Sequence, residues 1–337
     1  MIKSAFVLLA GVALAILPAT AQAAPAYSVV DKIAGPDGGW DYASFDAATG
    51  KLYVAHGTAV LAVDVATRAA VNLAPANGAH QAMAIDGGKT VVETDGKTGT
   101  TRFIDAATGV VQTEVATGVK PDAAFYDRAT ARVVVMSPGN DTVTQIDAVT
   151  HKVVNSFKLA GGLEFAVPDG KGRAFVNLED GNAIAEIDLK AGKLLRKIAL
   201  PGCTGPTGLA LVGNGTRLIS ACANGVAMVV DAVSGRVVGH LDTGKGADAV
   251  LVDEQRGMAF IPCGGSGTLV AISIGDARHI AVVGTIPTQI SARTGALDPR
   301  DGRIYLPVAT FAAPEPGAKR GKQTPGSFMV LVVAPQA

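Results

Sequence analysis

The chain has 337 residues, of which 48% are hydrophobic and only 17% are charged, and it contains 41 glycines. This composition is typical of a protein of strands and turns with enough apolar residues for a large core. The 29 basic and 29 acidic side chains cancel. Electrostatics therefore make a nucleic acid an unexpected partner and give no attraction to an anionic membrane surface.

Residues 1–23 have the pattern of a secretory signal peptide. Lys3 provides a short positive region, residues 5–17 are an apolar run too short to span a bilayer, and Ala21-Gln22-Ala23 is a small-x-small cleavage site. We expect export to the periplasm, a mature chain that begins at Ala24, and no membrane span after cleavage. An uncleaved membrane anchor is the alternative. Residues 24–337 contain no linker or run of like charge, which predicts a single domain.

A repeat with a period of about 42 residues organises the mature chain. An aspartate marks the copies at Asp64, Asp105, Asp147, Asp188 and Asp231, with spacings of 41, 42, 41 and 43 residues, and Ser273 takes this place 42 residues further on. A fixed period in this range indicates units that stack on their neighbours because none can bury its own faces.

Each repeat unit contains four strand-like runs. In the first unit they are residues 41–46, 51–56, 59–65 and 69–75, separated by turns with Gly, Ala and Thr. The first three kinds of run occur seven times, whereas the last unit has no fourth run after it. Residues 27–34 have the fourth-run pattern and precede the first unit.

These counts predict an all-β, seven-bladed β-propeller with four antiparallel strands in each blade. The N-terminal strand completes the last blade, and this closure removes the open sheet edges. A six-bladed propeller or a solenoid would leave one unit unplaced.

The sequence resembles the YVTN-repeat, YncE-like propellers that bacteria export, and the resemblance covers residues 27–334. It is carried by Gly39-Trp40-Asp41-Tyr42, Leu52-Tyr53-Val54, Lys120-Pro121-Asp122-Ala123, Glu164-Phe165-Ala166-Val167, Asn177-Leu178-Glu179-Asp180, Pro206-Thr207-Gly208-Leu209, Pro287-Thr288-Gln289 and Pro325-Gly326-Ser327-Phe328. The resemblance implies the propeller fold and export. It implies no particular activity, because the activity of this family is mostly unassigned.

Three cysteines in an oxidising compartment allow one disulfide and one free thiol. Cys203 lies in the loop before the fifth unit and Cys222 ends the second strand of that unit, so the chain direction places both on one face. Similar family members have this pair in the same LPxC and SxC contexts. We therefore predict a Cys203–Cys222 disulfide and interpret Cys263 as a small buried apolar residue.

Local cofactor motifs are absent from the sequence. It contains no CxxCH, CxxC, HExxH or EF-hand loop. No cofactor is predicted, although a divalent cation remains possible at the polar positions described next.

Alignment of the seven units reveals a polar ring at the start of the innermost strands, made of Asp41, Gln81, Asp122, Glu164, Gly208, Asp248 and Arg293. Trp40 and His80 precede two of these positions. The starts of the innermost strands share one face of a propeller, so we expect these side chains to converge at one mouth of the central channel. Four carboxylates there would repel one another unless Arg293, Lys120, a cation or protonation offsets them.

Two interpretations of the polar ring remain open. In the first, Trp40, Asp41, His80, Gln81, Asp122, Glu164, Asp248 and Arg293 bind a ligand; Arg293 would hold an anionic group, and a metal ion would take Asp41, Asp122, Glu164 and Asp248. In the second, these residues hydrogen-bond to loop backbones and fix the spacing of the blades, and Trp40 is a packing residue.

Three classes of function are compatible with the sequence. The leading hypothesis is a monomeric, non-catalytic binding or scaffold protein that holds a small molecule, ion or peptide at the channel mouth. The second is a lactonase or lyase in which a divalent cation polarises a carbonyl and His80 or a carboxylate transfers a proton. The third is an interaction platform for a protein partner.

Overall fold

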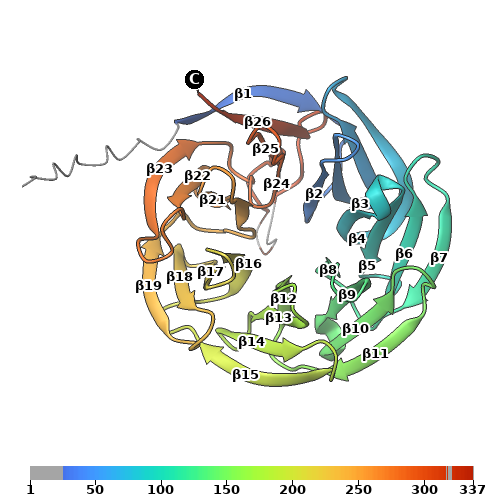
Figure 1. The fold of residues 1–337 in the computed structure, drawn as a ribbon. Coiled ribbons are helices and arrows are strands. Elements are labelled where there is room, and N and C mark those ends of the chain that lie inside the picture. The colour runs from blue at the N-terminus through green and yellow to red at the C-terminus, as the bar shows by residue number, and fades with distance from the viewer. Residues whose placement is uncertain (1–25, 316, 318–320, 337) are drawn as a thin grey trace, which may run out of the picture.

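The computed structural model describes residues 26–315, 317 and 321–336, and it shows strands arranged around a central opening (Figure 1). The expected signal peptide at residues 1–23 and the cleavage before Ala24 lie outside the described residues. Among the helices that the structure describes, none is long and apolar enough to cross a membrane.

The chain folds into 26 strands that form six hydrogen-bonded sheets. The largest sheet contains six strands, β2 (Ala43–Asp46), β3 (Lys51–Asp64), β4 (Ala69–Ile85), β5 (Thr90–Asp95), β6 (Thr100–Asp105) and β7 (Val111–Ala116). The short 3₁₀ turns η1 (Asp86–Gly88) and η2 (Pro138–Asn140) interrupt the connections after β4 and β9.

The next two sheets have four strands each. One contains β8 (Ala124–Asp127), β9 (Arg132–Ser137), β10 (Thr142–Asp147) and β11 (Val153–Lys158), and the other contains β12 (Leu163–Pro168), β13 (Arg173–Leu178), β14 (Ala183–Asp188) and β15 (Lys193–Ala199).

Two more four-stranded sheets follow, and a third closes the ring. They contain β16 (Pro206–Val212), β17 (Arg217–Cys222), β18 (Val226–Asp231) and β19 (Val237–Asp242); then β20 (Leu251–Asp253), β21 (Met258–Cys263), β22 (Thr268–Ser273) and β23 (Ala281–Pro287); then β24 (Ala296–Leu297), β25 (Ile304–Val308), β26 (Met329–Pro335) and β1 (Tyr27–Ala34).

The six-stranded sheet corrects the sequence prediction. Strand β3 continues through Gly57, and β4 continues from the end of the first repeat unit into the start of the second, where Gly57 pairs with Ala79. Because this pairing joins the first two repeat units in one sheet, the propeller has six blades when blades are counted as hydrogen-bonded sheets. The prediction of seven separate four-stranded blades is therefore wrong.

The predicted closure by the N-terminal strand is confirmed. Strand β1 pairs antiparallel with β26, from Tyr27 opposite Pro335 to Ala34 opposite Met329. The ring of Tyr27 packs edge-on against Phe260 of the preceding sheet, with a centroid distance of 4.7 Å. The two ends of the chain thus hold each other in place, which leaves β26 with a partner on both sides.

The repeating aspartates act as turn caps. In the turn after β6, a side-chain oxygen of Asp105 accepts hydrogen bonds from the backbone N–H groups of Ala107 and Thr108 and from the Thr108 hydroxyl. Gly109 completes this turn with a φ of 74°, and a Cβ at this position would lie 1.9 Å from the carbonyl oxygen of Leu73. The aspartates recur at a fixed spacing in the sequence because each repeat unit contains this turn, which needs a side-chain acceptor at that position.

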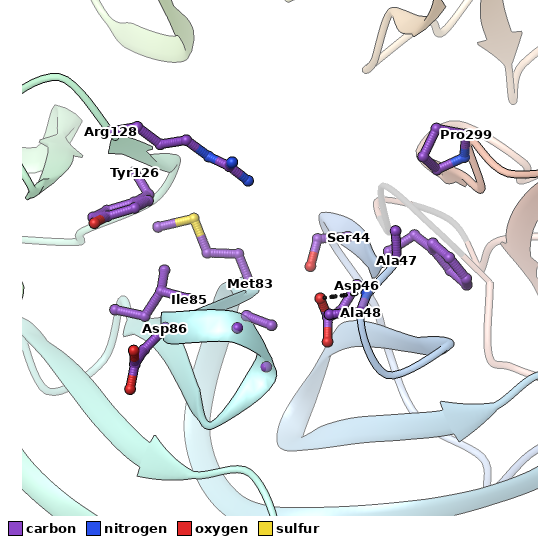
Figure 2. Close-up of a pocket in the computed structure, with 14 residues that line it drawn as sticks. Ser44, Asp46, Ala47, Ala48, Met83, Ile85, Asp86, Tyr126, Arg128 and Pro299 are labelled. Carbon is purple, nitrogen blue, oxygen red and sulfur yellow. Dashed lines mark hydrogen bonds between the residues drawn. The ribbon is translucent and has the colours of Figure 1, made fainter.

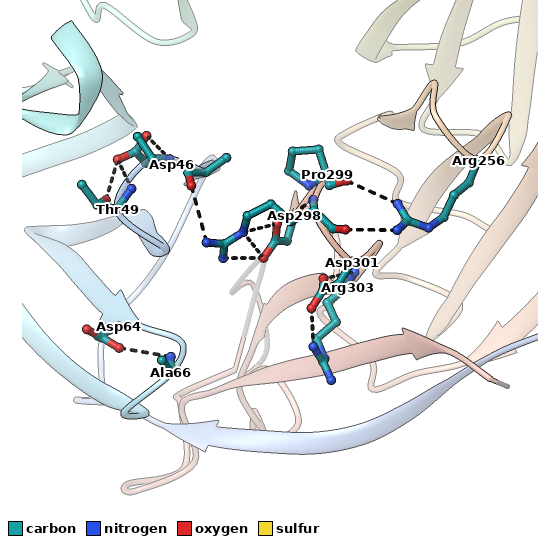
Figure 3. A network of polar contacts seen from close by, with 12 residues as sticks. Asp46, Thr49, Asp64, Ala66, Arg256, Asp298, Pro299, Asp301 and Arg303 are labelled. Atoms are coloured by element: carbon teal, nitrogen blue, oxygen red, sulfur yellow. Dashed lines mark hydrogen bonds and ion pairs between the residues drawn. The ribbon is translucent and has the colours of Figure 1, made fainter.

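Arginines also join neighbouring sheets at the turn between β24 and β25 (Figure 3). Arg256 donates to the carbonyl oxygens of Pro299 and Arg300, at 3.4 and 3.3 Å. Arg300 forms an ion pair with Asp298 at 2.7 Å and donates to the carbonyl oxygen of Ala47 in the turn after β2. These contacts tie the closing sheet to both of its neighbours.

The structure contains the predicted disulfide between Cys203 and Cys222. It connects the loop after β15 to the end of β17 across 19 residues of sequence. Cys263 is a buried free cysteine, in agreement with its interpretation as a packing residue.

Candidate functional site

The innermost strands bring the starts of distant repeat units to one mouth of the channel. Strands β2, β8, β12, β16 and β24 surround the central opening (Figure 1). At their starts lies a cavity of about 350 Å³, here called the acidic mouth, lined by Asp41, Tyr42, His80, Lys120, Asp122, Glu164, Glu179, Thr207, Gly246, Ala247, Asp248 and Arg293. Six residues that the sequence singles out as ligand-binding therefore share one cavity: Asp41, His80, Asp122, Glu164, Asp248 and Arg293.

Two other residues of the proposed ligand set have a different environment. Trp40 is only 5% exposed and packs against Phe311 and Phe328, with ring centroids 6.0 and 5.6 Å away. Gln81 is 4% exposed, and its backbone N–H donates to the Thr94 hydroxyl. Neither side chain lines the cavity. Their expected place beside the carboxylates is corrected, because Trp40 serves the apolar core and Gln81 lies within the sheet.

Arg293 holds two sides of the acidic mouth together. Its Nε donates to Asp248 Oδ2 at 2.9 Å, and one Nη donates both to Asp41 Oδ1 at 3.2 Å and to the carbonyl oxygen of Trp40 at 2.9 Å. Burial raises the pKa of Asp248 to about 6, although the Arg293 charge acts in the opposite direction. Because its charge is already shared by two carboxylates, Arg293 is a poor anchor for the anionic group that the sequence suggested.

His80 lies between two carboxylates. Its Nδ1 is 2.7 Å from Asp41 Oδ2 and 3.6 Å from Asp122 Oδ1. The hydrogen bond to Asp41 is the main cause that raises the pKa of His80. On the other side of the ring, a Cβ at position 96 would lie 2.7 Å from His80 Nε2. Gly96 has no Cβ and therefore leaves room for the imidazole.

Asp41, His80 and Asp122 also form a possible metal-ligand set. Each offers one ligand atom, and these three atoms lie within 4.8 Å of one another. A histidine nitrogen with two carboxylate oxygens is a donor set that suits Zn²⁺ or Mn²⁺. A metal ion there would replace the proton shared by His80 and Asp41.

Asp122 is the least compensated carboxylate. The backbone of this residue is fixed, since its N–H donates to the carbonyl oxygen of Met136 and its C=O accepts from the Thr94 hydroxyl. The residue is only 8% exposed, yet within the described part of the chain its carboxylate accepts no hydrogen bond. Burial, followed by the charge of Asp41, raises the pKa of Asp122 to about 7.

Glu164 faces the same cavity and has one donor. The Tyr42 hydroxyl donates to Glu164 Oε2 at 3.1 Å. Burial and then the charges of Asp122 and Asp248 raise the pKa of Glu164 to about 9, and burial raises the pKa of Tyr42 well above its usual value. At neutral pH this carboxyl group therefore keeps its proton.

The alignment of the repeats missed Tyr42 and Glu179. Glu179 follows β13, and the loops after the second strands reach the same face as the starts of the innermost strands. That topological rule, applied to every loop, would have found Glu179. Tyr42 directly follows Asp41, and only the direction of its side chain toward Glu164 reveals its role.

Comparisons with known proteins define the fold. No protein-family model and no curated protein sequence matches the chain. The structure is similar to a chain of Kuenenia stuttgartiensis hydrazine synthase, with a TM-score of 0.71, 13% identity, and coverage of 87% of this chain and 96% of the other. The Kuenenia chain is too distant in sequence to indicate a shared function.

Two further solved structures support the same conclusion. A chain of the Mitotic Checkpoint Complex has a TM-score of 0.75 at 10% identity and covers 99% of both chains. The WD40 repeats of RRP9 have a TM-score of 0.76 at 10% identity, and the match covers 92% of this chain and 99% of the other. The similarity to YncE-like YVTN repeats in particular remains a sequence-based expectation. The chain has a β-propeller fold like that of these solved structures.

Proposed function

We propose that this chain is an exported binding propeller that holds a small cation at the acidic mouth. The observation that carries the proposal is the excess of carboxylates in one cavity. Asp41, Asp122, Glu164, Glu179 and Asp248 share that cavity with Arg293, Lys120 and His80. Because Glu164 keeps its proton at neutral pH, the other four acids face three bases when His80 is charged, and a bound cation would offset the remaining negative charge.

Asp122 supplies the strongest local reason for a cation. It is nearly buried, and its carboxylate has only a long contact with His80, whose Nδ1 is 3.6 Å away and lies closer to Asp41. A divalent ion held by Asp41, His80 and Asp122 would give this carboxylate a closer partner. An organic ammonium group has the same sign of charge and is the competing occupant.

The direct test is calorimetric titration of the mature protein after treatment with a chelator. The titrants are Zn²⁺, Mn²⁺ and Ca²⁺ and, as an organic dication, putrescine. We expect one of them to bind, and Asp122→Asn to weaken its binding about tenfold or more, because the variant keeps the shape and removes the charge.

Asp86→Asn is the matched control, since Asp86 is an exposed aspartate outside the acidic mouth. Its affinity for the same titrant should stay within about twofold of the parent. Binding that is equal in the Asp122→Asn and parent proteins, or no binding of any titrant, would contradict the proposal and favour a purely structural ring.

An enzyme is the second candidate, and the protonation of the site favours it. Glu164 is protonated at neutral pH and Asp122 has a pKa of about 7, so the cavity contains one group suited to donate a proton and another suited to exchange one. In a lactonase or lyase these groups would act on a carbonyl substrate polarised by the cation. Turnover of lactones by the metal-loaded protein, lost in Asp122→Asn, would support this function over simple binding.

The interaction platform has a weaker basis. The fold is shared with a chain of the Mitotic Checkpoint Complex, an assembly of proteins, but a shared propeller fold does not transfer partners. Among the described residues, no feature marks a separate protein-binding surface beside the acidic mouth.

A further inference from the structure

A second cavity lies at the opposite ends of the innermost strands. It has a volume of about 620 Å³ and is lined by Ser44, Phe45, Asp46, Ala47, Ala48, Met83, Ala84, Ile85, Asp86, Gly87, Gly88, Tyr126, Arg128 and Pro299 (Figure 2). We call it the opposite mouth. The acidic mouth lies where β2 and β8 begin, and the opposite mouth lies where they end, so no residue is shared by the two cavities.

The register of the repeats explains why distant residues meet there. Ala47, Gly87, Arg128 and Pro299 each follow an aspartate that lies at, or directly after, the end of an innermost strand, and all four line the cavity. Arg128 is the only basic residue among these four. Its positive charge is therefore placed beside three equivalent positions that are small or apolar.

We propose that the opposite mouth binds a small amphipathic carboxylate, with Arg128 as the anchor of the anionic group. In the described part of the chain, Arg128 makes no hydrogen bond or ion pair, and Figure 2 shows its side chain extending over the cavity toward Pro299. A guanidinium group presents donors in a fork that matches a carboxylate. Unlike Arg293, this arginine has its charge available.

The floor of the cavity suits an apolar body. Met83 and Ile85 are buried beneath the opening. Phe45 is held in place between two partners, because its ring stacks on Tyr305 at 5.6 Å and the Arg300 guanidinium lies 5.1 Å from its centroid. A cavity of this volume, whose lining is divided about equally between polar and apolar surface, has the size of a small-molecule site.

The two acids of the opposite mouth, Asp46 and Asp86, repel a bound anion less than the acids of the acidic mouth would. The Asp46 carboxylate accepts hydrogen bonds from the backbone N–H groups of Ala48 and Thr49 and from the Thr49 hydroxyl, which offsets its charge. Asp86 is exposed, and its carboxylate points away from the space between Arg128 and Pro299 (Figure 2). The free charge that faces this space is positive.

The rim opposite Arg128 is held by polar contacts. Arg256 donates to the carbonyl oxygen of Pro299 (Figure 3), and Arg300 of the same turn forms an ion pair with Asp298. A preformed rim reduces the entropy that a bound ligand would lose through ordering of the protein. The proposal does not depend on any ligand of the acidic mouth.

The test is a titration of the mature protein with octanoate, observed by ligand-detected NMR and calorimetry. Octanol lacks the anionic group and acetate lacks the apolar body, so both should bind at least about tenfold more weakly than octanoate. Arg128→Gln should weaken octanoate about tenfold or more. Arg236→Gln, which changes an exposed arginine far along the outer strands, should leave the affinity within about twofold.

A second variant tests the place rather than the charge. Ala48 is exposed at the rim, and Ala48→Trp should fill the cavity and abolish octanoate binding while the protein stays folded. Asp122→Asn at the acidic mouth should have no effect on octanoate. The proposal is overturned if octanoate does not bind at millimolar concentration, if Arg128→Gln and Ala48→Trp bind it normally, or if Asp122→Asn removes the binding.

Discussion

The two mouths of the channel use the same residue type in opposite ways. At the acidic mouth, Asp122 begins an innermost strand, is nearly buried and accepts no hydrogen bond among the described contacts. At the opposite mouth, Asp46 ends an innermost strand and accepts three hydrogen bonds from its own turn. An aspartate that caps a turn stabilises the fold, whereas a nearly buried aspartate without a close donor costs stability.

The arginines show the same contrast. Arg293 at the acidic mouth is bound to Asp41 and Asp248 and compensates buried charge. Arg128 at the opposite mouth forms no ion pair with a described residue, so its charge compensates no carboxylate there. The acidic mouth therefore has negative charge available to a ligand, and the opposite mouth has positive charge available. This difference suggests that the propeller receives ligands of opposite sign at its two ends.

The largest expected effect is the loss of Arg293. In Arg293→Met, Asp41 and Asp248 lose their shared counter-charge inside a largely buried site, and the free energy of unfolding should fall by about 3–5 kcal/mol at pH 8. Because the pKa of Asp248 is raised to about 6, the loss should be smaller at pH 5, where this carboxyl is protonated. Urea unfolding at the two pH values measures both effects.

Arg236→Met serves as the control for that experiment, because Arg236 is exposed on an outer strand turn. It should change the free energy of unfolding by less than about 0.5 kcal/mol. A loss below about 1 kcal/mol in Arg293→Met would mean that the acidic mouth does not depend on this arginine.

The disulfide gives the next largest effect. Cys203 and Cys222 close a loop with a sequence separation of 19 residues, and this loop contains Thr207 of the acidic mouth. The double variant Cys203→Ser/Cys222→Ser should lose about 3 kcal/mol of unfolding free energy by the loop-entropy model. Thermal unfolding with and without a reductant provides the check: reductant should lower the Tm of the parent and leave that of the variant unchanged. A parent that is insensitive to complete reduction would contradict the prediction.

The sequence could predict most of the fold because repeat spacing and turn chemistry are local signals. The turn that Asp105 and Gly109 form recurs with a regular period. Residues 27–34 have the pattern of a fourth strand, and the last repeat unit lacks one, which predicts that they complete the last blade. The number of sheets could not be predicted, since it depends on whether Gly57 pairs with Ala79 across two units. That pairing depends on the backbone geometry of a few residues, which the repeat pattern does not determine.

The candidate site was predictable to the level of backbone register. Alignment of the units brings Asp41, Asp122 and Arg293 to one mouth, but it does not give side-chain directions. The Trp40 side chain packs against Phe328 in the core, and Arg293 donates hydrogen bonds to Asp41 and Asp248. The opposite mouth carries the same register signal, in the residues that follow the aspartates at the ends of the innermost strands.

A change of pH should affect the two mouths differently. Burial raises the pKa of Glu164 from 4.5 to about 9, so the folded state holds this proton more tightly than the unfolded chain does. The folded state should therefore lose stability progressively as the pH rises from about 5 to about 9. Glu164→Gln removes the cost of ionisation and should flatten the decline.

The Tm of the cation-free protein, measured from pH 5 to pH 9, tests this expectation. Glu164→Gln should be more stable than the parent at pH 9 and close to it at pH 5, whereas Asp86→Asn at the opposite mouth should follow the parent throughout. If the parent becomes more stable toward pH 9, or if Glu164→Gln is destabilised at every pH, the Glu164 carboxyl is ionised in the folded state.

The smallest expected effect concerns Arg128. Its guanidinium has no partner among the described residues and is exposed, so Arg128→Gln should change the free energy of unfolding by less than about 0.5 kcal/mol. Arg293→Gln, measured in the same urea series, should be destabilised by several kilocalories per mole because its partners are two partly buried carboxylates that share its charge. A loss above about 1 kcal/mol in Arg128→Gln would show that this arginine stabilises the fold through a contact of its own. The charge of Arg128 would then be unavailable to a carboxylate ligand. Both mouths would contain an arginine that is already paired, and they would differ only in how deeply the pair is buried.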